Sequence, residues 1–197
     1  MPLVILVLTA AISLVSLVQF LVPPGVEDQM FAVGAVAGGP GFQGVYRPWG
    51  DLAPYLLHVF LHGGMIHLAM NVAALLSFGS AVALDLGRGW RGGLLFLAFF
   101  ALCAAGGAGL QVFWFDRAGE NGIAIGASSA ISGLLPAFGY SRGGIGGALR
   151  ASAPWLLINV VFLALGGVFS LPIAWAAHIG GLLAGLSFPL FRALARA

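Results

Sequence analysis

The sequence alternates between long apolar runs and short stretches that hold almost all of its charges. Uncharged apolar runs of roughly 18–23 residues have the length that an α-helix needs to cross a bilayer. The runs are separated by connections rich in Gly, Pro and Arg, and a tight turn is expected around residues 170–172. They predict an all-α membrane protein with six transmembrane helices, at residues 3–22, 64–84, 93–115, 122–140, 153–169 and 172–191.

The first connection, residues 23–63, is too long for a simple loop between two helices. It begins with Pro- and Gly-rich sequence and ends in the apolar segment 52–61, which is too short to span. Segments of that length are typically re-entrant or interfacial, so we expect a long, partly re-entrant first loop. No Lys or Arg precedes the run 3–22, which is also longer than a signal-peptide core, so it is interpreted as a retained helix.

Composition places the whole chain in the membrane. Hydrophobic residues make up 60% of the 197 residues and charged residues 7%, whereas a soluble domain is about a quarter charged. No polar stretch is long enough to form a separate domain, so residues 1–197 are interpreted as one membrane domain. The arginines are scattered and no lysine is present, so the chain has no basic patch for nucleic acid. Cys103 is interpreted as a buried packing residue.

The arginines also indicate an orientation. Most of them fall in the second and fourth connections and after the last span, whereas the first and third connections hold only Arg47 and Arg117, beside most of the acidic residues. Since cytoplasmic loops carry an excess of Lys and Arg, both termini are predicted to be cytoplasmic. The small size and the use of arginine without lysine suggest a bacterial plasma membrane. The predicted cytoplasmic set is Arg88, Arg91, Arg142, Arg150, Arg192 and Arg196.

Four polar side chains within these spans lie at a common depth. His67 and Asn71 lie three and seven residues into the second span, and Ser128 and His178 each lie about six residues into theirs. At 1.5 Å per residue, all four are roughly 5–10 Å below the outer surface. Polar groups are costly in a membrane and indicate a functional site by default. A serine and a histidine that meet there, with further donors nearby, indicate acyl-transfer chemistry.

His67 and Asn71 are four residues apart and therefore share one helical face. An imidazole beside a carboxamide suits either an oxyanion or a metal ion. His58 and His62 are possible further metal ligands, but no acidic residue or cysteine lies at comparable depth, so no metal is expected. The alternative is structural, with both side chains hydrogen-bonded to the backbone of a neighbouring connection.

Ser128 follows Gly126, where the backbone can be closely approached at a helix start. Free N–H groups at such a start can face a developing oxyanion. Ser129 and Ser132 are competing candidates, and serines in membrane helices are often only packing residues. Because no Asp or Glu lies within a span, Ser128 and His178 would form a dyad rather than a triad.

Small residues follow the candidate nucleophile and base at matching intervals. Gly181 and Gly185 form a Gly-xxx-Gly pair beyond His178, and Ser129 and Gly133 form a similar small-xxx-small pair. Such faces let two helix backbones approach closely. A hydrogen bond between the fourth and sixth helices requires that approach.

Three motifs, in this order, resemble those of the rhomboid intramembrane serine proteases. They are His-Gly-Gly at 62–64 followed by His67 and Asn71, Gly-Ala-Ser at 126–128, and Ala-His-Ile-Gly-Gly at 177–181 followed by Gly185. The resemblance covers nearly the whole chain and implies a six-helix bundle with Ser128 as the nucleophile and His178 as the base. It also implies an oxyanion hole formed by His67, Asn71 and the backbone N–H of Ser128, with supporting positions at His62, Gly126, Gly181 and Gly185.

The chain departs from the family pattern at several positions. Ser129 stands where glycine usually follows the nucleophile, and Ser132 replaces an aromatic residue that commonly packs against the catalytic histidine. The usual glutamate at the end of the second helix is missing, with Asp85 and Arg88 close by. None of these changes removes a catalytic group.

The resemblance implies an endopeptidase that cleaves single-span membrane proteins near the outer face of the bilayer. It implies no cofactor and no nucleic-acid partner, and the sequence does not indicate an oligomeric state. Two other functions remain open. One is a non-proteolytic rhomboid-like protein that binds membrane helices. The other is a small transporter that uses the polar residues as a pathway, although no internal repeat of the kind common in transporters is seen.

Overall fold

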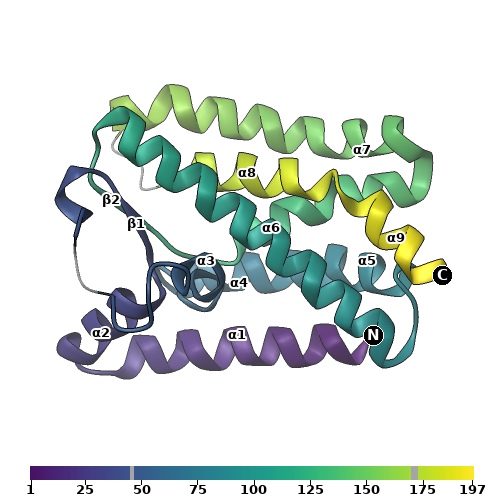
Figure 1. Cartoon of the computed structure of the whole chain (residues 1–197), viewed down its shortest axis with the longest axis horizontal. Helices are drawn as coiled ribbons and strands as arrows, with labels where there is room; N and C mark the ends of the chain where they lie inside the picture. Colours follow the sequence, from purple (N-terminus) through teal and green to yellow (C-terminus); the bar gives the residue numbers. More distant parts are fainter. Residues whose placement is uncertain (45–46, 170–172) are drawn as a thin grey trace.

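The computed structural model describes residues 1–44, 47–169 and 173–197, which are mostly helical. Helix α1 (Leu3–Leu21) and the later part of α7 (Ser128–Phe169) form opposite edges of a bundle, and α6 (Gly89–Ala118) crosses diagonally between them (Figure 1). Helix α8 (Trp175–Gly185) packs against both α6 and α7. The turn expected around residues 170–172 lies outside the described residues.

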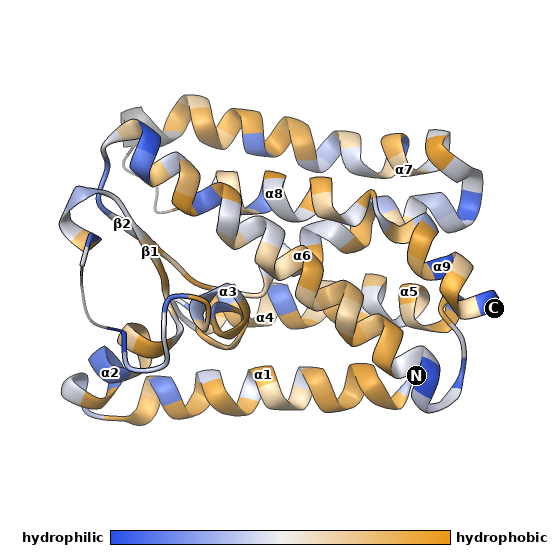
Figure 2. Cartoon of the chain, viewed as in Figure 1, coloured by the Kyte–Doolittle hydropathy of each residue, from blue (hydrophilic) through white to orange (hydrophobic). Residues whose placement is uncertain are grey.

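Five helical segments among the described residues are long and apolar enough to cross a membrane. Hydrophobic residues cover most of their length, and hydrophilic residues gather toward the ends of the bundle (Figure 2). The first and third predicted spans correspond to α1 and α6. The second is built from α4 (Met65–Ala74), the π-helical turn η3 (Leu75–Gly79) and α5 (Ser80–Asp85), and the last from α8 and α9 (Phe188–Arg196).

The fifth predicted span and most of the fourth, from Ser128 on, fall within α7. The helix is interrupted at Gly143 and Gly144, and Gly144 has a φ of 56° that favours glycine. A Cβ atom added to Gly139 would overlap the carbonyl oxygen of Gly147, so the residues before and after the interruption lie against each other. Helix α7 therefore has a first limb, 128–142, and a second limb, 145–169, which run side by side (Figure 1).

The first limb begins at Ser128 rather than at residue 122 as predicted. Residues Gly122–Ala124 instead form strand β2, which pairs antiparallel with β1 (Val36–Gly38). Gly126 then has a φ of 111°, outside the helical region. The apolar sequence of 122–127 resembles a helix start, but the backbone of its first three residues pairs with β1.

The first connection is folded against α1 rather than extended. It contains α2 (Pro24–Gly34), β1, the 3₁₀ turn η1 (Pro40–Phe42), α3 (Pro54–Leu57) and the 3₁₀ turn η2 (His58–Phe60). The side chain of Gln19 pairs with the backbone of His62, accepting from its N–H and donating to its carbonyl, each at 2.9 Å. Ser16 Oγ donates to the carbonyl of Phe60 at 2.9 Å.

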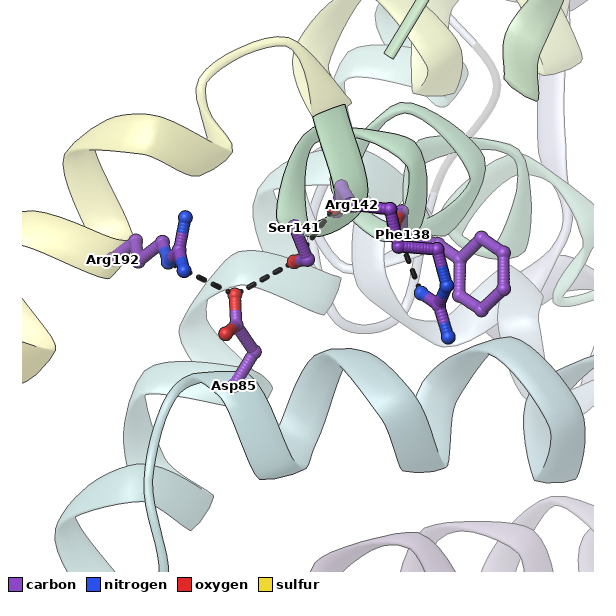
Figure 3. A network of polar contacts seen from close by, with 6 residues as sticks. Asp85, Phe138, Ser141, Arg142 and Arg192 are labelled. Atoms are coloured by element: carbon purple, nitrogen blue, oxygen red, sulfur yellow. Dashed lines mark hydrogen bonds and ion pairs between the residues drawn. The ribbon is translucent and has the colours of Figure 1, made fainter. Parts of the chain in front are cut away.

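A polar cluster ties three helices together at the end of the bundle away from Ser128. Asp85 of α5 accepts a hydrogen bond from Ser141 of α7 at 2.7 Å and lies 3.1 Å from the guanidinium of Arg192 of α9 (Figure 3). At 1.5 Å per residue, Ser141 is about 20 Å along the first limb from Ser128. Large apolar side chains, including Phe96, Phe99 and Phe188, fill the core between the two ends.

Candidate active site

Ser128 and His178 lie within hydrogen-bonding distance of each other across two helices. Ser128 is the first residue of α7 and is half-buried, and His178 is in the first turn of α8 and 6% exposed. Ser128 Oγ lies 2.8 Å from His178 Nε2. The structure thus brings together the serine and histidine that the sequence placed at one depth.

Close packing of small residues makes this approach possible. A Cβ atom at Gly181 would overlap the carbonyl oxygen of Ser129, and one at Gly185 would overlap that of Gly133. The two small-residue faces predicted from the sequence are therefore in direct backbone contact. Gln111 of α6 also accepts a hydrogen bond from the N–H of Ala177 at 3.0 Å, which satisfies a donor in the first turn of α8.

A third polar residue contacts His178, and the sequence analysis missed it. Asn159 Oδ1, from the second limb of α7, lies 2.7 Å from His178 Nδ1, and the asparagine side chain is almost fully buried, at 1% exposure. Asn159 belongs to no recognised motif. The signal was nevertheless present, because a lone asparagine in the apolar span 153–169 satisfies the same rule that singled out His67 and His178.

An aromatic ring also lies beside His178, but it comes from an unexpected place. The ring of Trp155 lies 5.1 Å from the imidazole, tilted by 44°. Its Nε1–H donates to Ser132 Oγ at 2.8 Å, and Ser132 Oγ donates to the carbonyl of Ser128 at 2.7 Å. The small side chain at 132 thus leaves room for an indole from the second limb beside the imidazole.

Ser129 is hydrogen-bonded to a different histidine, His58. His58 Nε2 lies 2.8 Å from Ser129 Oγ, and His58 Nδ1 lies 2.8 Å from the carbonyl of Pro54. A carbonyl only accepts, so Nδ1 carries the proton and Nε2 accepts from the serine. Burial lowers the pKa of His58 to about 4, only partly opposed by the hydrogen bond to Pro54, so the ring is neutral near pH 7. This pair joins the first connection to the start of α7.

His67 faces the turn that precedes Ser128. Its Nδ1 accepts from the backbone N–H of Gly63 at 3.3 Å, so in the neutral ring the proton is on Nε2. A Cβ atom on Gly126 would lie 2.7 Å from that Nε2, so only glycine leaves space for the ring. Asn71 Nδ2 donates to the carbonyl of His67 at 2.8 Å, which leaves a second amide hydrogen for another acceptor.

His62 and His58 are bonded to other parts of the chain rather than gathered around a common point. His62 Nδ1 lies 2.8 Å from Ser16 Oγ of α1, and its ring is 5.0 Å from that of His67. Across the described ranges 1–44, 47–169 and 173–197, no three His, Cys, Asp or Glu side chains are grouped as a metal site would require.

Comparison with known families identifies the chain. The family model of the rhomboid domain matches residues 49–194, well over half of the sequence and including Ser128 and His178. The chain therefore belongs to the rhomboid family, whose members are in general intramembrane serine proteases. No curated protein sequence matches it closely enough to be counted as a relative.

Proposed function

We propose that this rhomboid is an active serine endopeptidase that cleaves transmembrane segments near the outer face of the membrane. The observation that carries the proposal is the 2.8 Å contact between Ser128 Oγ and His178 Nε2 at the start of two helices. Membership of the rhomboid family supports the reaction class. Ser128 is the nucleophile, and His178 is the general base.

The proposed chemistry needs a base for the proton of Ser128 and hydrogen-bond donors for the oxyanion. His178 Nε2 takes the proton of Ser128 Oγ as that oxygen attacks the scissile carbonyl, and later gives it to the leaving amine. The negative charge on the carbonyl oxygen is stabilised by the backbone N–H of Ser128 and by donors from His67 and Asn71. Water then hydrolyses the acyl-enzyme by the same route.

The arrangement in the membrane is part of the proposal. The two limbs of α7 serve as separate crossings, so that six helices span the bilayer with both termini in the cytoplasm. The first connection then enters the outer leaflet as a partly re-entrant loop. Its folded-back backbone, held to α1 through Gln19 and Ser16, supports such a position.

The substrates are single-span membrane proteins whose helix is weakened near the outer face. A transmembrane helix has its carbonyls hydrogen-bonded internally, so it must unwind before Ser128 can reach one. Residues that weaken the helix locally lower the cost of that step. Cleavage should therefore occur close to Gly, Pro or polar residues in the outer part of the substrate helix.

Labelling by a serine-directed fluorophosphonate tests this function directly. The serine oxygen displaces fluoride from phosphorus, and the proton passes to the histidine. The purified protein in detergent should be labelled and should cleave a single-span reporter. Ser128→Ala should abolish both while leaving the protein folded. It removes the donor to His178 Nε2, so the thermal unfolding midpoint should fall by no more than in Ser129→Ala.

Ser129→Ala is the matched control. It removes the neighbouring hydroxyl and leaves His58 Nε2 without its donor, which costs about 1–3 kcal/mol of stability. Labelling should nonetheless persist at Ser128. Labelling that survives Ser128→Ala and disappears in Ser129→Ala would move the nucleophile by one residue. A folded wild-type protein that takes no label would favour the helix-binding, non-proteolytic alternative.

A further inference from the structure

The amide of Asn159 is held in one orientation by its own helix. Its Nδ2 donates to the carbonyl of Trp155, one turn earlier, at 2.8 Å. A carbonyl oxygen accepts but cannot donate, so the nitrogen end of the amide must face Trp155. The oxygen end is therefore the one that lies 2.7 Å from His178 Nδ1.

This orientation determines which nitrogen of His178 carries the proton. Asn159 Oδ1 can only accept, so the short contact requires a proton on Nδ1. The other tautomer would place two acceptors 2.7 Å apart. Rotating the amide would only move the clash to the carbonyl of Trp155. Both side chains are buried, at 1% and 6% exposure, so water offers little compensation.

The tautomer selected in this way is the one that a general base requires. With the proton on Nδ1, Nε2 has a free lone pair directed at Ser128 Oγ, 2.8 Å away. An asparagine in this position is chemically sufficient, since Cys-His-Asn proteases use the same partner for their histidine. A neutral amide also avoids placing a carboxylate in a membrane span, where charge is costly.

The second limb of α7 presents these groups on one face. Ser152, Trp155 and Asn159 point into the bundle, whereas Leu157 and Val160 are 65% and 52% exposed. Trp155 packs beside the imidazole and is itself bonded to Ser132 of the first limb. On the inward face of the limb, Asn159 therefore contacts the Nδ1 edge of the His178 ring, and Trp155 packs against the ring.

We infer that Asn159 is a positioning residue that holds the proton of His178 on Nδ1, so that the second limb of α7 completes a Ser-His-Asn arrangement. The inference rests on the proposed function for its kinetic consequence, but the tautomer itself is a property of the folded protein. Trp155 assists by fixing the plane of the ring.

Three variants separate this role from general packing. Asn159→Leu removes the acceptor and should lower kcat on the order of 10²-fold or more, with a much smaller change in KM. Asn159→Asp keeps an acceptor for Nδ1 but places its second oxygen against the carbonyl of Trp155, so it should be more active than Asn159→Leu and less active than the wild type. Its carboxylate would favour the imidazolium, so the acid limb of the pH–rate profile should move to higher pH. His67, the other titratable group that interacts with His178, is unchanged throughout.

Ser152→Ala is the matched control for loosening of the limb. Ser152 is buried on the same face, and its hydroxyl has no hydrogen-bond partner among the residues that the structure describes. The substitution should leave kcat and the pH profile unchanged. If Ser152→Ala and Asn159→Leu lower kcat equally, the effect is structural and the inference is wrong.

The tautomer is measured independently of proteolysis by ¹⁵N NMR of histidine-labelled protein in detergent. The wild type should show His178 protonated at Nδ1, and Asn159→Leu should show both tautomers or the opposite one. A wild-type ring protonated at Nε2, or an unchanged tautomer in Asn159→Leu, overturns the inference. An inactive wild type with the expected tautomer would contradict the proposed function alone.

Discussion

His67 and His178 both direct Nε2 toward the surroundings of Ser128, but in opposite hydrogen-bonding roles. The N–H of Gly63 occupies Nδ1 of His67, which leaves an Nε2–H donor. Asn159 Oδ1 occupies Nδ1 of His178, which leaves an Nε2 acceptor. One residue type can thus supply both a hydrogen-bond donor for an oxyanion and a base for a hydroxyl. The backbone and amide partners, rather than the imidazoles, make the difference.

The proposed oxyanion donors make a prediction at this scale. His67→Ala and Asn71→Ala should each lower kcat by on the order of 10²–10³, the usual cost of one oxyanion donor. Fluorophosphonate labelling should become slower but still reach completion, since Ser128 and His178 remain in place. Reporter cleavage and labelling rates measure the two effects.

Ser77→Ala is the control for this experiment. Ser77 lies on the same span but is exposed, and its hydroxyl donates to the carbonyl of Ala73, one turn earlier. It should behave like the wild type. Full activity in either test variant, or inhibition of the wild type by a metal chelator, contradicts the assigned roles.

Residues that belong to spaced motifs could be predicted from the sequence, whereas their partners could not. His67, Ser128 and His178 stand out because each is polar, follows a recognisable pattern and lies at one depth. Asn159 and Trp155 have no fixed spacing to those motifs, and only the packing of the second limb brings them to His178. The choice of Ser128 over Ser129 depended on one glycine in the sequence, whereas the structure gives each serine a different histidine.

At the scale of elements, hydropathy located the helices but not their ends. The apolar residues 122–127 extend the fourth predicted span, yet residues Gly122–Ala124 pair with β1, more than 80 positions earlier in the chain. The predicted spans leave residues 141–152 as a connection, yet these residues are helical except at Gly143 and Gly144. Both differences arise because hydropathy reports side chains and not backbone hydrogen bonds.

The contact between α8 and the first limb makes a prediction for Gly181. In Gly181→Ala the new methyl group would overlap the carbonyl of Ser129, so the two helices must separate. Overpacking of this kind costs about 1–3 kcal/mol, and the separation should lengthen the contact between Ser128 and His178. Both the thermal unfolding midpoint and kcat should fall.

Gly93→Ala is the corresponding control within a spanning helix. A Cβ atom there would make only an ordinary contact, 3.6 Å from Val4 Cβ. Stability and activity should stay near wild-type values or rise slightly, because alanine favours the helix. A Gly181→Ala variant that is as stable and active as Gly93→Ala would show that the helices can separate without cost.

At the scale of the whole molecule, the two ends of the bundle differ in chemistry. One end holds Ser128 and His178 with neutral partners, and the other holds the cluster of Asp85, Ser141 and Arg192 (Figure 3). Asp85, at the end of the second span, supplies a carboxylate that joins three helices. The charged cluster suits the cytoplasmic side that the arginines predict.

The orientation is tested by single cysteines at Glu120 and Arg150 in a Cys103→Ala background. Both positions are exposed. Glu120 precedes the first limb of α7, and Arg150 follows its other end. An impermeant maleimide applied to intact cells should label the cysteine at 120 and not the one at 150, and lysis should make both reactive. The reverse pattern would invert the topology and place cleavage at the cytoplasmic face.

The pair formed by Ser129 and His58 affects structural searches that identify serine proteases from a Ser–His distance. Its Oγ–Nε2 distance is 2.8 Å, the same as that between Ser128 and His178. A search template for a serine bonded to a histidine would therefore select both pairs in adjacent residues of one chain. Ser129 is 1% exposed, whereas Ser128 is only half-buried. If Ser128 is the nucleophile as proposed, the two serines differ in access to the hydroxyl oxygen rather than in the hydrogen bond that each makes.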